Sequence, residues 1–122
     1  MPLTTAALNN LLDCGLRTQT PTIGITHASL HTATPNSSGS NEVTGGSPAY
    51  ARKSITLAAA SGGAVAASNQ PVFDVPAATT VSHVGFFSAI TSGTFMGYAD
   101  VTDEAFGAQG TYTLTSATVT LT

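Results

Sequence analysis

Hydrophobic positions near the start of the chain recur with the spacing of a helix. Leu8, Leu11 and Leu12 stand at i, i+3 and i+4, which places them on one face of a helix. Thr4 can cap the N-terminus of this helix, because its hydroxyl can accept a free backbone N–H. The pattern therefore predicts one short helix over residues 3–16. Since a helix of this length is marginal alone in water, we expect its leucine face to dock on its own sheet or on a neighbouring subunit.

Beyond the helix, apolar and polar residues alternate as they do in β-strands. Short alternating stretches are separated by segments rich in Gly, Pro, Ser and Asn. Residues 80–89 form the best central strand, because both faces carry bulky side chains and Gly85 lets another backbone or ring approach closely. The expected strands cover residues 22–31, 50–57, 64–66, 72–75, 80–89 and 95–99, and parts of 111–122.

Two changes of phase interrupt this alternation. The apolar residues change parity within 22–31 and again in the tail. A one-residue shift of that kind moves side chains to the other face of a sheet. We therefore expect a bulge or bend near 27–29 and a bulge or break at 116–118.

The set of elements predicts the fold class. One short N-terminal helix and six to eight short strands joined by turns are typical of an antiparallel β-sandwich. The length of 122 residues is that of one domain and can bury a core without metals or disulfides. We expect a mainly β protein with a single β-sandwich domain over residues 1–122.

Two longer loops are expected at 34–48 and 100–110. The first is rich in Pro, Asn, Ser and Gly. At about 15 residues it is long for a compact domain, and loops of this length tend to be functional or disordered. Asn41, Glu42 and Val43 interrupt the small residues in its middle, which favours an ordered loop.

Polar residues beside the 34–48 loop suggest how it is held. Arg52, one of only three basic residues, follows the loop closely. An arginine in a charge-poor protein can bind a carboxylate or loop carbonyls through its fork of donors. We therefore hypothesise that Arg52 holds this loop, with Glu42 as its candidate partner; solvated side chains are the alternative. His31 is expected to anchor the same loop through its ring nitrogens, and Tyr50 begins the strand that carries Arg52.

Composition argues against several classes of partner. Only 7% of the residues are charged and the net charge is −3, so no basic patch for nucleic acid can be assembled. No run approaches the ~18 apolar residues of a membrane span, and the start lacks the pattern of a signal peptide. We expect a protein that is made in the host cytoplasm and binds neither nucleic acid nor membranes. The low charge favours a surface covered by partners over a polar-coated monomer.

No pattern of catalytic or metal-binding residues stands out. A three-histidine metal site is chemically possible, but His27 and His31 would lie about 13 Å apart on a strand. Asp100, Asp103 and Glu104 lack the spacing of a calcium loop, and we expect a solvated turn in which Asp103 or Thr102 caps a helical turn. No nucleophile elbow, phosphate loop or zinc-protease motif is present. We expect no enzymatic activity, no cofactor and no metal.

Several runs of residues carry a resemblance to known proteins. The most specific are LHT at 30–32, NEVTGG at 41–46 and YAR at 50–52. VGFF at 84–87 and the leading LTTAALNNLLD at 3–13 extend the similarity over most of the chain. With these runs, the chain resembles a family of small structural proteins of tailed-phage and prophage virions. Members of that family are described as tail-fibre-like or as head-decoration proteins.

The resemblance implies a non-catalytic protein located in the virion and bound to other virion proteins. Our leading expectation is a capsid decoration or minor capsid protein that binds the head exterior as a homo-oligomer, in contact with the major capsid protein. A tail-fibre or tail-tip component, in contact with tail proteins, is the alternative. A carbohydrate-binding β-sandwich is less favoured, because the chain has no Trp. The candidate structural and interface residues are Leu8, Leu11, Leu12, His31, Glu42, Tyr50 and Arg52.

Overall fold

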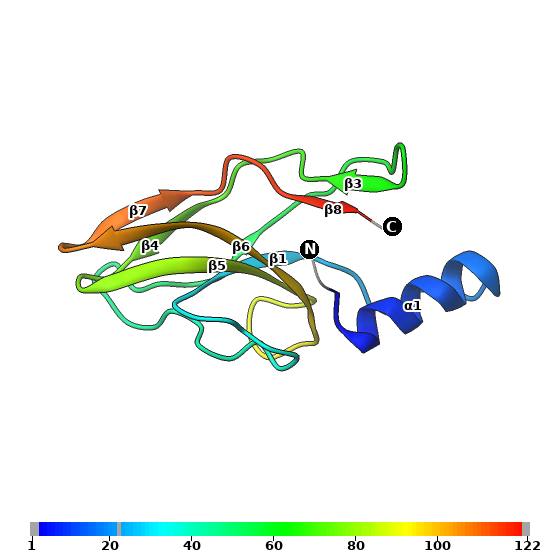
Figure 1. The fold of residues 1–122 in the computed structure, drawn as a ribbon, viewed down its shortest axis with the longest axis horizontal. Coiled ribbons are helices and arrows are strands. Elements are labelled where there is room, and N and C mark those ends of the chain that lie inside the picture. Colours follow the sequence, from blue (N-terminus) through cyan, green and yellow to red (C-terminus); the bar gives the residue numbers. More distant parts are fainter. Residues whose placement is uncertain (1–2, 22, 121–122) are drawn as a thin grey trace.

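A computed structural model describes residues 3–21 and 23–120. Within these residues it contains one helix and eight strands, and the strand pairs are antiparallel, which confirms the predicted mainly β class (Figure 1). In chain order the elements are α1 (Thr5–Leu16), β1 (His27–His31), β2 (Lys53–Ser54), β3 (Ala64–Ala66), β4 (Val72–Val75), β5 (Thr79–Phe87), β6 (Phe95–Phe106), β7 (Gly110–Thr113) and β8 (Thr118–Thr120).

The strands form a main sheet and two smaller ribbons. The main sheet has the order β2-β1-β5-β6, and the ribbons pair β4 with β7 and β3 with β8. In Figure 1 the two ribbons lie over the main sheet as a second layer. The structure is therefore consistent with the expected sandwich.

The core fills the space between the two layers. Leu30 on β1 lies opposite Val84 on β5 in the register of the sheet, and both are buried. Phe86 follows on the same face of β5, two residues further along, as the period of a strand requires. Phe73 and Val75 supply the contribution of β4 and are fully buried. Apolar burial on this face is the main stabilising term of the fold.

The opposite face of the main sheet is buried as well. Ser29 and His31 on β1 are fully buried, and Phe87 on β5 is almost so. Residues 34–41 pack over this face, where Gly39 approaches Phe87 closely. The prediction that the central strand is covered on both faces is therefore confirmed.

The first strand differs from the prediction. β1 covers only His27–His31, and residues 23–26 precede it without strand pairing. The five residues of β1 pair with β5 one for one, so the bulge predicted near 27–29 is wrong. The apparent change of phase has another cause: four of the five residues of β1 are buried, and burial on both faces removes the alternation.

Two further boundaries are corrected. The strand expected over 50–57 is reduced to Lys53–Ser54. The loop expected at 100–110 is wrong in its first half, because β6 extends from Phe95 to Phe106, with an irregularity at residues 101–103 where its pairing with β5 shifts register. Asp100, Asp103 and Glu104 therefore lie on a strand, not in a turn that caps a helix. They are exposed there, since β6 is at the edge of the main sheet and carboxylates at an edge stay solvated.

Other predictions are confirmed by the structure. Strands lie at 64–66 and 72–75, and β7 ends at Thr113 before β8 begins at Thr118, which accounts for the change of phase at 116–118. Thr4 is the N-cap of α1, and its hydroxyl accepts a hydrogen bond from the Ala7 N–H at 3.3 Å. The same hydroxyl donates to the carbonyl of Phe95 at 2.8 Å, which ties the start of α1 to β6.

Candidate functional site

An ion pair between Arg52 and Glu42 lies at the centre of the site. The Arg52 Nε and Nη2 atoms each donate to one oxygen of the Glu42 carboxylate, both at 2.9 Å. Two parallel bonds of this kind are the strongest geometry available to an arginine and a carboxylate. The side chains are only 11% and 20% exposed, respectively, so the alternative of two solvated groups does not hold. Glu42 belongs to the 34–48 loop, and the pair therefore connects the loop to the chain that follows it.

The remaining nitrogen of the Arg52 guanidinium extends these contacts to the β5–β6 turn. Nη1 donates to the carbonyl of Ser92 at 2.8 Å and to that of Ala89 at 3.1 Å. The guanidinium carbon lies 3.4 Å from the centre of the Phe87 ring, a cation–π geometry. One side chain thus joins the loop, the end of β5 and the turn that leads into β6.

Tyr50 links the same carboxylate to the core. Its hydroxyl donates to Glu42 Oε2 at 2.8 Å and accepts from the Leu30 N–H at 3.0 Å. The ring stacks on Phe73 with the ring centres 6.4 Å apart. Burial, followed by the nearby Glu42 charge, raises the pKa of the Tyr50 hydroxyl. Tyr50 therefore remains a protonated donor at neutral pH.

His31 holds the other arm of the loop. Its Nδ1 lies 2.8 Å from the carbonyl oxygen of Ser40, which can only accept, so Nδ1 carries the proton. Nε2 is then the acceptor for the hydroxyl of Ser29, also at 2.8 Å. Burial lowers the pKa of His31 from its ordinary value, against the opposing effect of the hydrogen bond to Ser40. The neutral ring thus ties the loop backbone to β1, and this geometry agrees with the anchoring role expected for His31.

Two glycines allow this close packing. A Cβ on Gly39, whose φ is +74°, would lie 2.6 Å from the Cζ of Phe87. A Cβ on Gly85 would lie 2.6 Å from the His31 ring, which is the close approach of a ring expected at that position. Gly39, Ser40 and Phe87 were not among the candidate residues. In the sequence, Gly39 stands out only as a glycine within a run of small residues. Its partner, Phe87, lies on a distant strand.

The structure separates the seven candidate residues into two places. His31, Glu42, Tyr50 and Arg52 meet around the loop, and we call them, with Ser29 and Ser40, the loop network. Leu8, Leu11 and Leu12 lie apart on α1, with 41%, 41% and 53% of their surface exposed. An apolar groove of about 170 Å³ runs beside Leu11, between α1, residues 23–25 and the paired strands β3 and β8.

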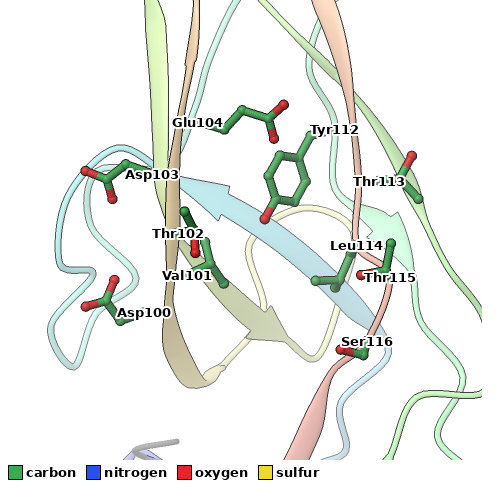
Figure 2. A pocket seen from close by; sticks show the side chains of 10 residues that line it. All are labelled: Asp100, Val101, Thr102, Asp103, Glu104, Tyr112, Thr113, Leu114, Thr115 and Ser116. Carbon is green, nitrogen blue, oxygen red and sulfur yellow. The ribbon is translucent and has the colours of Figure 1, made fainter.

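A second hollow lies between β6 and β7 (Figure 2). It has a volume of about 540 Å³ and is open to solvent. The Tyr112 ring lies between Glu104 and Leu114 in this view. Burial, followed by the Glu104 charge, raises the pKa of the Tyr112 hydroxyl. The acidic residues on its wall are exposed, as expected for a solvated strand edge.

Over residues 3–21 and 23–120, no three His, Cys, Asp or Glu side chains gather as ligands for a metal ion. No helix in that part of the chain is long and apolar enough to cross a membrane.

Comparison with protein families identifies relatives of the chain. Residues 2–122 match the family described as podophage GP4 fiber I protein gp80. The chain belongs to this family. No curated protein matches the chain.

Membership in the gp80 family bears on the expectations drawn from the sequence. The resemblance to structural proteins of phage virions is confirmed. Because the family is one of phage fibre proteins, the chain has a structural role in a phage virion, in association with other virion components. Capsid decoration, the leading expectation, is not confirmed, and the family fits the tail-fibre alternative better.

Proposed function

We propose that the protein is a structural subunit of a phage tail fibre and that it catalyses no reaction. The match of residues 2–122 to a family of podophage fibre proteins carries this proposal. The matched region includes the helix, every described strand and the loop network. The proposal therefore rests on a match over nearly the whole chain and not on one motif.

The loop network supports a structural role. A general acid or base must reach the proton that it transfers to or from a substrate. Here both ring nitrogens of His31 are bonded to Ser40 and Ser29, and the Tyr50 hydroxyl is bonded to Glu42 and Leu30. Polar groups engaged in this way hold the 34–48 loop in one conformation. A fibre subunit needs such a rigid surface in order to repeat the same contacts in every copy.

The placement of apolar and charged residues supports assembly with other proteins. The chain has nine Asp, Glu, Lys and Arg residues in 122, so neighbouring copies carry little charge to repel one another. The leucines of α1 are partly exposed. Exposed apolar side chains that gather in a patch are typical of interaction sites. We propose that the fibre contains several copies of the chain, each in contact with other tail proteins.

Immunogold labelling of purified virions tests the proposed location. An antibody raised against the purified chain is applied to intact particles, and electron microscopy locates the gold. Gold on fibres attached to the tail is the expected result. Gold over the head surface would overturn the fibre proposal in favour of capsid decoration, and purified virions that lack the protein by mass spectrometry would overturn a virion role altogether. Antibody pre-absorbed with the purified chain is the control for non-specific gold.

Co-sedimentation gives an independent test of the same proposal. The purified chain is mixed separately with isolated heads and with isolated tails from particles that lack it. Saturable binding to tails is expected. Saturable binding to heads alone would contradict the proposal, because a fibre subunit has no reason to recognise the capsid lattice.

A further inference from the structure

We propose that His31 is a pH-sensitive latch: when its ring takes up a second proton, residues 34–41 lift from the main sheet and uncover Phe87 and Phe95. We call residues 34–41 the loop arm. The rest of the 34–48 loop stays in place, because Glu42 remains bound to Arg52. The inference goes beyond the proposed fibre function and does not depend on it.

The loop arm is a thin cover that is closed on itself. The Pro35 carbonyl accepts from the Ser40 N–H at 2.8 Å, and most residues of the arm are exposed. Among the described residues, hydrogen bonds attach the arm to β1 and its end at two places. One is the bond from the His31 ring to the Ser40 carbonyl. The other joins Thr32 to the Asn41 carbonyl, with the N–H at 3.0 Å. The arm can therefore move as one piece, as compact surface loops do.

Aromatic side chains lie beneath the loop arm. Phe87 and Phe95 are each 5% exposed, and their ring centres are 5.0 Å apart. A Cβ on Gly39 would lie 2.6 Å from Phe87 and 3.0 Å from Phe95, so the backbone of the arm rests directly on both rings. The centre of the His31 ring is 6.0 Å from that of Phe95 and 6.5 Å from that of Phe87. Movement of the arm therefore exposes two phenylalanines and admits water to His31.

The closed site accepts only the neutral ring of His31. Nδ1 already carries the proton that is donated to Ser40, so a second proton must be placed on Nε2, which lies 2.8 Å from the Ser29 hydroxyl. That hydroxyl would then have to accept a hydrogen bond instead of donating one. Within the described part of the chain, its hydrogen-bond partner is Nε2 alone, and Ser29 is fully buried. Its hydrogen would therefore be left without an acceptor, which is costly in a buried site.

The groups that face His31 do not compensate a second positive charge. Arg52 and His83 are both basic, and His83 lies opposite His31 in the register of β1 and β5. Glu42 faces the ring as well, but both of its oxygens are already bonded to Arg52. Burial lowers the pKa of His31, and this effect outweighs the opposing effects of the Ser40 bond and of Glu42. The ring thus binds a proton more readily when the arm is open, so acid favours opening.

This linkage sets the size of the effect. The ordinary pKa of a histidine, 6.5, applies to the open form, and the pKa of His31 in the closed form is lower. The equilibrium constant for opening is therefore nearly constant well above pH 6.5. It rises as the pH falls below 6.5, by at most about tenfold per pH unit, until the pH reaches the lowered pKa. Between pH 7.5 and 5.0 we expect a rise of about five- to 30-fold.

Amide hydrogen exchange of the purified chain, followed by NMR at pH 7.5 and 5.0, tests the latch. The Thr32 N–H is the reporter, because its bond to the Asn41 carbonyl breaks when the arm lifts. The Val43 N–H is the matched control, since it bonds to the Leu30 carbonyl at 3.0 Å in the part of the loop that stays in place. After correction for intrinsic exchange, protection of Thr32 should fall about five- to 30-fold at pH 5.0. Protection of Val43 should fall by less than about twofold.

Two variants test which group takes up the proton. In His31→Asn the titrating ring is absent, so protection of Thr32 should change by less than about twofold between the two pH values. His83→Asn is the matched control on the neighbouring strand and should keep the wild-type fall. A fall that persists in His31→Asn would overturn the inference, because another group, such as Glu42, would then carry the pH dependence.

Two results with the wild-type chain alone would also overturn the latch. Equal protection of Thr32 at both pH values would mean that the arm does not open in acid. An equal fall at Thr32 and Val43 would mean that the whole loop or the whole chain unfolds. These measurements decide the question even if circular dichroism shows that His31→Asn is not folded. Failure of the latch would leave the fibre role, tested by labelling of virions, intact.

Discussion

The 34–48 loop and helix α1 differ in composition, and composition alone does not predict how either of them packs. The loop is rich in polar residues, yet it packs against the main sheet, with His31 and Phe87 buried beneath it. The helix has an apolar face, yet Leu12 and Leu16 are 53% and 79% exposed. The difference teaches that hydrogen-bond partners, and not polarity alone, decide what this protein can bury.

The loop packs on the sheet, with most of its own residues still exposed, because the polar groups at the contact find partners. Over the part of the chain that the structure describes, no buried side-chain nitrogen or oxygen lacks a hydrogen bond. Burying a polar group is costly only when it loses water and gains nothing in return. The leucines of α1 have no such restriction, but they require a surface to cover them. The sandwich uses its own apolar surfaces for the core and leaves much of this face exposed.

Removal of Arg52 should have the largest effect on the loop side of this comparison. In Arg52→Ala the Glu42 carboxylate would stay mostly buried without its cation, so we expect a loss of about 3 kcal/mol in the free energy of unfolding. Urea unfolding measures the loss, and limited proteolysis shows whether the loop opens. The double variant Glu42→Gln/Arg52→Met should lose less, because it leaves no unpaired charge. Unchanged stability and protease resistance in Arg52→Ala would show that the pair does not hold the loop.

Packing beneath the loop is tested by a pair of glycine variants. Gly39→Ala would place a Cβ 2.6 Å from Phe87, and overpacking of this kind costs about 2 kcal/mol. Gly45→Ala is the matched control, since Gly45 also has a positive φ but open space around it. We expect only the backbone cost there, about 1 kcal/mol. Equal losses in the two variants, measured by urea unfolding, would mean that contact with Phe87 contributes nothing.

The pH dependence of stability tests the histidine anchor. Burial lowers the pKa of His31 below 6.5, so the unfolded chain binds the proton more readily than the folded one. The stability that comes from neutral His31 is therefore fully present above pH 6.5 and is lost as the pH falls through the lowered pKa. Unfolding free energies at pH 7.5 and 5.0 measure this. His31→Asn should show a smaller loss on acidification than the wild type or His27→Asn; equal losses would contradict the assignment.

The smallest effect is expected on the helix side. Leu12→Ala should change the free energy of unfolding of the monomer by less than about 0.5 kcal/mol, as for other exposed positions. Leu30→Ala is the matched control, because Leu30 is fully buried and its truncation leaves a cavity that costs about 3 kcal/mol. Urea unfolding at 5 μM, where we expect monomers, compares the two. A large loss in Leu12→Ala would show that Leu12 itself packs on the sandwich.

Local features could be predicted from the sequence. Residues near one another in the chain predicted the cap at Thr4 and the strands at 64–66 and 72–75. The small number of basic residues predicted the pairing of Arg52 with the loop. With three basic residues in 122, an ordered carboxylate in the loop had few cations to bind. For the same reason, Glu42 was a natural candidate as soon as the loop was taken to be ordered.

Features that depend on distant segments could not be predicted in this way. The alternation in β1 is hidden because the loop covers its second face, and the full length of β6 is hidden because its charged half lies at a solvated edge. Gly39 and Phe87 meet from segments almost 50 residues apart, and no local pattern marks their contact. The exposure of the leucine face was likewise undecided, since a sheet or a neighbour could cover it equally well.

The sequence by itself thus determined the kind of elements, the N-terminal cap and the residue types that could hold the loop. These depend on backbone propensity and on the small number of charges, both of which are properties of the chain before it folds. Only the tertiary structure decided that the polar loop lies against the sheet and that the apolar helix face points outward. Burial is a property of surfaces that meet in space, and here those surfaces come from parts of the chain that no local pattern connects.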